Sequence, residues 1–299
     1  MLFYLFSFII FLNKFSLVSQ PIPEPVIISE TRTVEEYPIS IGPILESKSA
    51  IVVDNQTGKI LFEKNKNEVS PVASLTKLMT AIVFLENRNK DWGEWVTYKK
   101  EDKLEPAWIN IAPGDQIKIK DVFNTALVGS ANDATLILAR LVKNPENFVE
   151  EMNKKARSFG MEKTKFLEPT GLDPKNVSTA SDLSILIKKA LEIEKIKETL
   201  QKKEIDFQIK KADGSFYWRR IKNTDKLLDS FINISGAKTG YLEESDYCFA
   251  GIGGSSPRRS GFGHAGGSSD GQSIVVVLGA PTSETRFKEA KILFWWGGK

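Results

Sequence analysis

The sequence predicts a mixed α/β fold in which strand-like segments come before and after a largely helical middle. Three observations support this prediction. Residues 50–63 have the pattern of a β-hairpin, residues 273–278 are the most strand-like run of the chain, and several segments between them carry apolar residues at helical spacing. The chain has 299 residues, of which 41% are hydrophobic and 26% are charged, so it can form a substantial core.

The composition excludes several kinds of function. The net charge of +3 is close to balanced and no basic patch with interleaved aromatic residues is present, so we expect no nucleic-acid partner. The single cysteine, Cys248, excludes an internal disulfide. The single histidine, His264, argues against a Ser-His-Asp triad and against a histidine-rich metal site. If a serine is the nucleophile, its base is therefore expected to be a lysine.

The N-terminal part of the chain predicts export. Residues 2–12 form an almost unbroken apolar run, which is short for a bilayer span but suits the core of an export signal. Alternating prolines from Pro21 onward indicate an extended linker. We expect a signal peptide or an N-terminal membrane anchor at 1–20, a proline-containing linker at 21–47 and one globular domain at 48–299. No basic residue precedes the run and no Ala-x-Ala site follows it, so cleavage and retention as a tether are both open.

The globular region opens with the hairpin and a helix. The runs 50–54 and 59–63 are joined by residues whose Asn and Gly suit a tight turn. A helix is expected over 75–85, and its apolar periodicity predicts that it is largely buried. Further expected elements are helices at 122–128, 135–142, 147–159, 183–191 (capped by 178–182) and 284–296, a hairpin within 207–217, and strands at 246–252 and 273–278. The Gly- and Ser-rich segment 253–271 is expected to be a flexible loop rather than a site.

A hydroxyl and an amine one helical turn apart are the first candidates for chemistry. Ser74 and Lys77 lie three residues apart at the start of the predicted helix, so their side chains share one face. The unpaired N–H groups and the dipole of a helix start can stabilise an anion beside Ser74. Burial would lower the pKa of Lys77, so that a neutral amine could accept a proton near pH 7. The pattern alone is not specific, because Ser235 and Lys238 repeat it.

A second polar pair, Ser130 and Asn132, falls between two of the predicted helices. Such a loop can direct both side chains into a cleft. Capping of the following helix is the alternative role for them, because serine and asparagine commonly fill it.

Three motifs in this order resemble the signature of the penicillin-recognising serine enzymes: Ser74-x-x-Lys77, Ser130-x-Asn132 and Lys238-Thr239-Gly240. Within that group the chain resembles a D-alanyl-D-alanine carboxypeptidase of the low-molecular-mass penicillin-binding type (peptidase family S11) over nearly all of 50–296. Further matching segments are 73–80, 130–134, 169–172, 178–182 and 278–281. The resemblance implies a β-lactamase/transpeptidase-like α+β fold: an antiparallel sheet flanked by helices, with an inserted all-helical subdomain and the active site in the cleft between them.

The resemblance also implies catalytic roles. Ser74 would attack the carbonyl between two D-alanines and form an acyl-enzyme, while Lys77 takes its proton. Ser130 would relay that proton to the leaving amine. The N–H groups of Ser74 and Tyr241 would form the oxyanion hole, and water would then hydrolyse the ester.

Four further positions would bind substrate. Asn132 would bond to the substrate amide and hold Lys77. Lys238 and Thr239 would bind the terminal carboxylate, because a cation and a hydroxyl donor both favour an anion. Gly240 would leave room for the substrate backbone beside its strand.

Partners and location follow from the same resemblance. The expected substrate is a peptidoglycan stem peptide ending in D-Ala-D-Ala, and β-lactams are expected to be covalent inhibitors. Neither a metal nor an organic cofactor is expected. The catalytic domain, 48–299, would act in the periplasm or another extracytoplasmic part of the envelope, in peptidoglycan biosynthesis and cell shape. Any membrane association is expected through the N-terminus.

Three alternatives remain open on the sequence. Glu168 stands where the family usually has Asn, about where a class A β-lactamase carries the glutamate that activates water. The following 170–172 nevertheless fits the carboxypeptidase pattern. A DD-endopeptidase would share all of these motifs, because it also cleaves a D-alanyl bond. A non-catalytic cell-wall sensor would not require the complete set.

Overall fold

A computed structural model describes residues 42–255 and 271–298, which belong to one compact unit that begins at Gly42. The expectations for 1–20, for most of 21–47 and for His264 with most of 253–271 therefore lie outside the described residues. Within the described ranges, no helix combines the length and the hydropathy that a bilayer crossing requires.

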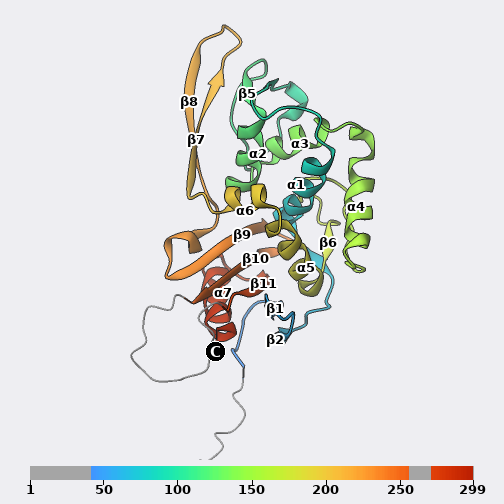
Figure 1. Cartoon of the computed structure of the whole chain (residues 1–299), viewed down its shortest axis with the longest axis vertical. Helices are drawn as coiled ribbons and strands as arrows, with labels where there is room; N and C mark the ends of the chain where they lie inside the picture. Colours follow the sequence, from blue (N-terminus) through green and yellow to red (C-terminus); the bar gives the residue numbers. More distant parts are fainter. Residues whose placement is uncertain (1–41, 256–270, 299) are drawn as a thin grey trace, which may run out of the picture. The chain divides into compact units, whose positions relative to one another are not determined.

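The central element is a five-stranded antiparallel sheet with the strand order β2-β1-β11-β10-β9 (Figure 1). The predicted hairpin is β1 and β2, and the most strand-like run of the sequence is the middle strand, β11, so both predictions are confirmed. The strands are β1 (Ser49–Asp54), β2 (Ile60–Lys64), β9 (Ile232–Leu242), β10 (Asp246–Ser255) and β11 (Ser273–Ala280).

Both faces of this sheet are covered by helices. Along β11, Val275 and Val277 pack in a core with Phe294 of α7 (Ser283–Gly297). The alternate residues Ile274 and Val276 belong to a second core, which includes α1 (Thr76–Asn87) and α5 (Ala180–Leu191). Because neither face is exposed, β11 has an unbroken apolar run rather than an alternating one. The expectation of an antiparallel sheet flanked by helices is confirmed.

The helices lie close to their predicted positions. Thr179 caps α5 as expected, since its Oγ1 accepts a hydrogen bond of 3.0 Å from the Asp182 N–H. The short helix α6 was not predicted, because seven residues give too little repetition of apolar spacing. The remaining helices are α2 (Ile119–Val128), α3 (Asn132–Arg140), α4 (Phe148–Ser158) and α6 (Glu194–Leu200). The 3-10 turns are η1 (Ala73–Leu75), η2 (Lys100–Asp102), η3 (Pro145–Asn147) and η4 (Lys226–Asp229).

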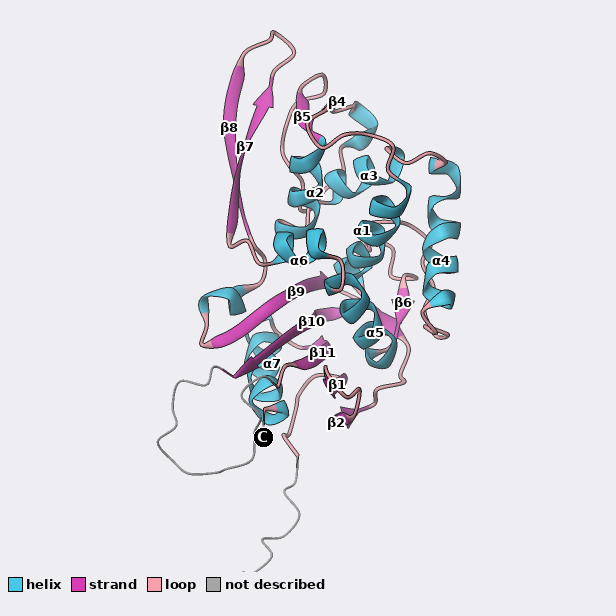
Figure 2. Cartoon of the chain, in the orientation of Figure 1, coloured by secondary structure: helices cyan, strands magenta, loops and turns pink. Residues whose placement is uncertain are grey.

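The prediction that the inserted subdomain is all-helical is wrong. A second sheet with the order β4-β5-β7-β8 stands beside α2, and its long β7–β8 hairpin is the one predicted within 207–217 (Figure 2). Strands β4 and β5 have three residues each, too few to show an alternating pattern, and β5 pairs with β7 across about ninety positions of sequence. The strands are β4 (Trp95–Thr97), β5 (Gln116–Lys118), β7 (Glu204–Lys210) and β8 (Phe216–Lys222), and β3 (Ser70–Pro71) pairs separately with β6 (Val177–Ser178).

Candidate active site

Ser74 lies in η1, which leads directly into α1. Two glycines pack against this turn from other parts of the chain. A Cβ on Gly171 would lie 1.9 Å from the Ala73 carbonyl oxygen, and a Cβ on Gly240 would lie 3.1 Å from the Ser74 nitrogen. Ala73 has a φ of 47°, in the left-handed region that non-glycine residues seldom adopt. Ser74 is therefore held, half-buried, where a loop containing Gly171 meets strand β9.

Lys77 extends into the interior beside Ser74, and its side chain is almost completely buried. Its Nζ lies 2.8 Å from Ser74 Oγ, 2.7 Å from Asn132 Oδ1 and 2.6 Å from the Thr170 carbonyl oxygen. Burial lowers the pKa of Lys77 to about 7, and the carboxylates of Glu168 and Asp133 partly oppose that shift. The amine can therefore exchange a proton near neutral pH.

The three partners of the Lys77 amine determine where its lone pair points. The amide oxygen of Asn132 and the carbonyl oxygen of Thr170 can only accept hydrogen bonds. The orientation of the Asn132 amide is set by its Nδ2, which donates to the Pro106 carbonyl. A neutral amine has two N–H donors, and these two acceptors use both of them. Its lone pair then faces the Ser74 hydroxyl, which is the geometry that a general base requires.

Ser130 and Asn132 lie between α2 and α3. Asn132 is the first residue of α3 and its side chain bonds to Lys77 and Pro106, so it does not cap the helix. Ser130 has a φ of 58°, also left-handed, and its Oγ accepts a hydrogen bond of 2.8 Å from Lys238 Nζ. The loop therefore links α1 on one side to β9 on the other.

Strand β9 supplies the remaining predicted residues. Lys238 is almost completely buried, and burial, followed by the charges of Lys77 and Arg286, lowers its pKa well below the usual value. Thr239 Oγ1 lies 2.7 Å from Thr224 Oγ1. Tyr241 is about half exposed and stacks on Tyr247 with ring centroids 4.4 Å apart. An anionic group that arrived beside Lys238 would favour its protonated form.

The predicted side chains thus form two hydrogen-bonded sets that lie against each other. One set is Ser74, Lys77 and Asn132, and the other is Ser130 and Lys238. Strand β9, which carries Lys238, packs against the η1 turn, which carries Ser74, so the two sets lie together and the charge of Lys77 contributes to the lowered pKa of Lys238. The arrangement can activate a hydroxyl nucleophile, move a proton through a second hydroxyl and bind an anion beside both.

Several supporting residues were not predicted. Asp133 is fully buried and accepts hydrogen bonds from the N–H groups of Ile109 and Ala134 and from the Tyr98 hydroxyl, at 2.9, 2.7 and 3.1 Å. Burial raises its pKa to about 6. These bonds fix the start of α3, which carries Asn132. Asp133 follows the Ser-x-Asn motif directly, so its position in the sequence was a usable signal.

Arg286 of α7 stabilises β9 and β10 through their backbone carbonyl groups. It is buried, and its Nη1 donates to the carbonyl oxygens of Gly240 and Cys248 at 3.0 and 3.4 Å. Burial lowers its pKa to about 10. No local pattern could have identified Arg286, because its partner Gly240 is 46 residues away in the sequence.

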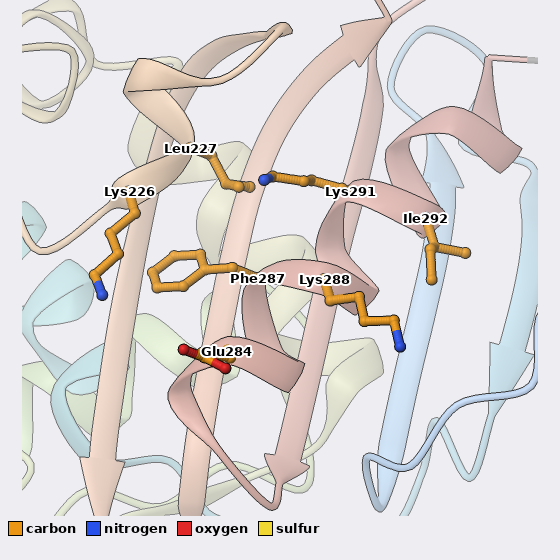
Figure 3. A pocket seen from close by; sticks show the side chains of 7 residues that line it. All are labelled: Lys226, Leu227, Glu284, Phe287, Lys288, Lys291 and Ile292. Atoms are coloured by element: carbon orange, nitrogen blue, oxygen red, sulfur yellow. The ribbon is translucent and has the colours of Figure 1, made fainter.

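A groove of about 500 Å³ lies between η4 and α7 and shares no residue with this site (Figure 3). Its lining combines apolar side chains with those of three lysines and one glutamate. It is lined by Lys226, Leu227, Glu284, Phe287, Lys288, Lys291 and Ile292.

Comparison with known proteins assigns the chain to a family. Residues 36–259 match the sequence model of peptidase family S11, described as D-alanyl-D-alanine carboxypeptidase. The D-alanyl-D-alanine carboxypeptidase DacF of Bacillus subtilis is 31% identical over 81% of this chain and 59% of its own length. A D-alanyl-D-alanine endopeptidase of Pseudomonas aeruginosa is 34% identical over 68% of this chain and 66% of its own length. The chain therefore spans about six-tenths to two-thirds of these relatives.

Solved structures agree with this assignment. Penicillin-binding protein D2 of Listeria monocytogenes, in its cefotaxime-bound form, is 30% identical with a TM-score of 0.69, over 86% of this chain and 99% of that one. The Streptomyces K15 DD-transpeptidase, at 24% identity, has the same fold with a TM-score of 0.76, over 86% and 98% of the two chains. The chain belongs to the D-alanyl-D-alanine carboxypeptidase family, peptidase family S11.

Proposed function

We propose that the protein is a serine-type D-Ala-D-Ala carboxypeptidase, which removes the terminal D-alanine from peptidoglycan stem peptides. The observation that carries this proposal is the set of three contacts of Lys77 Nζ with Ser74 Oγ, Asn132 Oδ1 and the Thr170 carbonyl oxygen, an arrangement in which a neutral amine can take the Ser74 proton. Family membership supports the choice of substrate, because related chains are named for D-alanyl-D-alanine peptidases.

The first half of the reaction acylates Ser74. Its Oγ attacks the carbonyl carbon between the two D-alanines, and Lys77 takes the hydroxyl proton. The oxyanion is held by the N–H groups of Ser74 and Tyr241, for which the close approach of Gly240 to the Ser74 nitrogen is support. Ser130 then gives a proton to the leaving nitrogen, the C–N bond breaks, and D-alanine departs. The proton that Lys77 took from Ser74 passes to Ser130, whose oxygen Lys238 holds by a hydrogen bond of 2.8 Å, so Lys77 is neutral again.

Substrate recognition falls to β9 and Asn132. Lys238 and Thr239 bind the terminal carboxylate, and the anion offsets the cost of a buried ammonium. Asn132 uses one N–H of its amide for Pro106, which leaves the second for the substrate amide. In the second half of the reaction, neutral Lys77 takes a proton from the water that attacks the ester and returns it to Ser74 Oγ as the ester bond breaks.

Incubation with a muropeptide ending in D-Ala-D-Ala, followed by mass analysis, tests this function. The proposal expects loss of one D-alanine, and no loss with Ser74→Ala. An intact muropeptide after incubation with the wild-type protein would contradict it.

An endopeptidase is the second candidate, because relatives at 34% and 32% identity bear that name. A cross-linked muropeptide dimer separates the two. Conversion of the dimer to monomers indicates an endopeptidase, whereas an intact dimer that loses terminal D-alanine indicates a carboxypeptidase.

We further propose that the protein acts outside the cytoplasm, with 1–20 as its signal peptide or membrane anchor, 21–47 as the linker and 48–299 as the catalytic domain. The apolar run at 2–12 supports this proposal. The mass of the exported protein and its release by an alkaline wash would distinguish cleavage from tethering.

A further inference from the structure

Glu168 stands where the resemblance to the family leads us to expect asparagine, and the structure places it at the centre of a loop beside Lys77. Its Oε2 accepts hydrogen bonds from the Thr170 N–H and hydroxyl, both at 2.6 Å. Its Oε1 accepts from the N–H groups of Gly171 at 2.5 Å and Asp173 at 3.4 Å, and from Asn176 Nδ2 at 3.0 Å. The loop 168–173 is therefore wrapped around one carboxylate.

These bonds leave Glu168 no acceptor site for another partner. A carboxylate offers about four lone-pair positions, and five donors already point at this one. A water molecule that was to give up a proton here would have to displace one of the loop's own hydrogen bonds. The geometry thus favours a structural and electrostatic role for Glu168 over the activation of water.

The same loop is bonded to the helix that carries the proposed nucleophile and base. The Thr170 carbonyl accepts from Lys77 Nζ at 2.6 Å, and the neighbouring Pro169 carbonyl accepts from Thr80 Oγ1 at 2.6 Å. The Nδ2 of Asn176 donates to Thr76 Oγ1 at 3.3 Å. The direction of the Thr170 carbonyl is consequently fixed from one side by α1 and from the other by the Glu168 carboxylate.

We propose that Glu168 is a positioning residue for Lys77: its carboxylate folds the loop that presents the Thr170 carbonyl to the amine, and its charge stabilises the ammonium that forms when Lys77 takes the Ser74 proton. This inference rests on the proposed function, in which Lys77 is the base.

Two carboxylates act on Lys77 from the elements around it. Those of Glu168 in the loop and Asp133 in α3 favour its protonated form, and the charge of Lys77 in turn lowers the pKa of the nearby Lys238 in β9. Removing the charge of Glu168 therefore lowers the pKa of Lys77 further. A glutamine in its place would also replace one carboxylate oxygen by an NH₂ group, which cannot accept hydrogen bonds. The loop would then lose the bonds that either Oε1 or Oε2 of Glu168 accepts.

The test compares Glu168→Gln with Glu168→Asp and with Glu162→Gln, which makes the same change at an exposed residue of the same segment. The rate of labelling by a fluorescent penicillin is measured from pH 5 to pH 9. For Glu168→Gln we expect the plateau rate to fall roughly ten- to hundredfold and the half-maximal pH to fall by about one unit. Glu168→Asp should lower the plateau without moving the midpoint, and Glu162→Gln should change neither.

Each other outcome overturns the inference in a recognisable way. A lower plateau with an unmoved midpoint in Glu168→Gln would mean that Glu168 only supports the fold. Normal labelling with slow release of the bound penicillin would make it a base for deacylation. If circular dichroism shows that Glu168→Gln does not fold, the Glu168→Asp variant provides the test. An unchanged plateau rate of labelling in Glu168→Asp would refute the positioning role of Glu168. Absence of labelling in the wild-type protein would overturn the proposed function itself.

Discussion

If Ser74 is acylated with Lys77 as its base, as proposed, the pH dependence of the reaction follows from the burial of Lys77. Burial lowers the pKa of this amine to about 7, and only the neutral form can take the serine proton. About half of the molecules are then active at pH 7 and roughly one in a hundred at pH 5. An exposed lysine with a pKa near 10.4 would be neutral in only about 0.04% of molecules at pH 7. The rate should therefore rise about tenfold per pH unit below 7 and level off above it.

The second-order rate constant for covalent labelling by a fluorescent penicillin, measured from pH 5 to pH 10, tests this expectation. Lys77→Ala should remain folded but label very slowly, without a midpoint near pH 7. A wild-type profile that is flat from pH 5 to pH 9 would refute the role of Lys77 as base. So would a rate that still climbs about tenfold between pH 8 and pH 9, because the amine would then behave as an exposed one.

Three further changes have defined outcomes. Gly171→Ala should lower the free energy of unfolding in urea by about 3 kcal/mol or more, because its Cβ would meet the Ala73 carbonyl at 1.9 Å. Gly160→Ala, also at positive φ but in open space, should lower the free energy of unfolding by only about 1 kcal/mol. Equal losses in the two variants would contradict the close packing of Gly171 against Ala73. Asn132→Asp adds a carboxylate beside Lys77, so the midpoint of labelling should move to higher pH, and a downward shift would contradict the contact. Lys238→Ala should reduce kcat/KM roughly thirtyfold for a peptide with a free terminal carboxylate, since a hydrogen bond to a charged group contributes about 2 kcal/mol. For the same peptide ending in an amide, the substitution should lower kcat/KM much less. An equal loss for both peptides would exclude binding of the carboxylate by Lys238.

Local patterns predicted most of the elements that carry the site. The hairpin at 50–63, the buried helix after Ser74 and the capped helix α5 each depend on residues close together in the sequence. Strands β4 and β5 were missed because they are three residues long and are stabilised by pairing with each other and with distant β7. The error of an all-helical subdomain therefore comes from long-range pairing, which a single sequence does not display.

The residues of the candidate site also divide into those that local sequence patterns predicted and those that they did not. Ser74 and Lys77 could be paired from helical spacing alone, and the ordered motifs pointed to Asn132 and Lys238. Their supports could not be found in this way. Arg286 bonds to a carbonyl 46 residues away, and the Thr170 carbonyl that contacts Lys77 is a backbone group, which any residue type would supply. Residue identity carries no signal for such contacts.

The identity of the nucleophile is the claim on which the mechanism depends, and intact-protein mass after reaction with benzylpenicillin tests it most directly. The wild-type protein should gain the mass of one penicilloyl group, located by peptide digestion at Ser74. Ser74→Ala should gain none, whereas Ser235→Ala, at the other Ser-x-x-Lys pattern, should react as the wild type does. Undiminished mass gain in Ser74→Ala, or an adduct located on Ser130 or Ser235, would contradict the account.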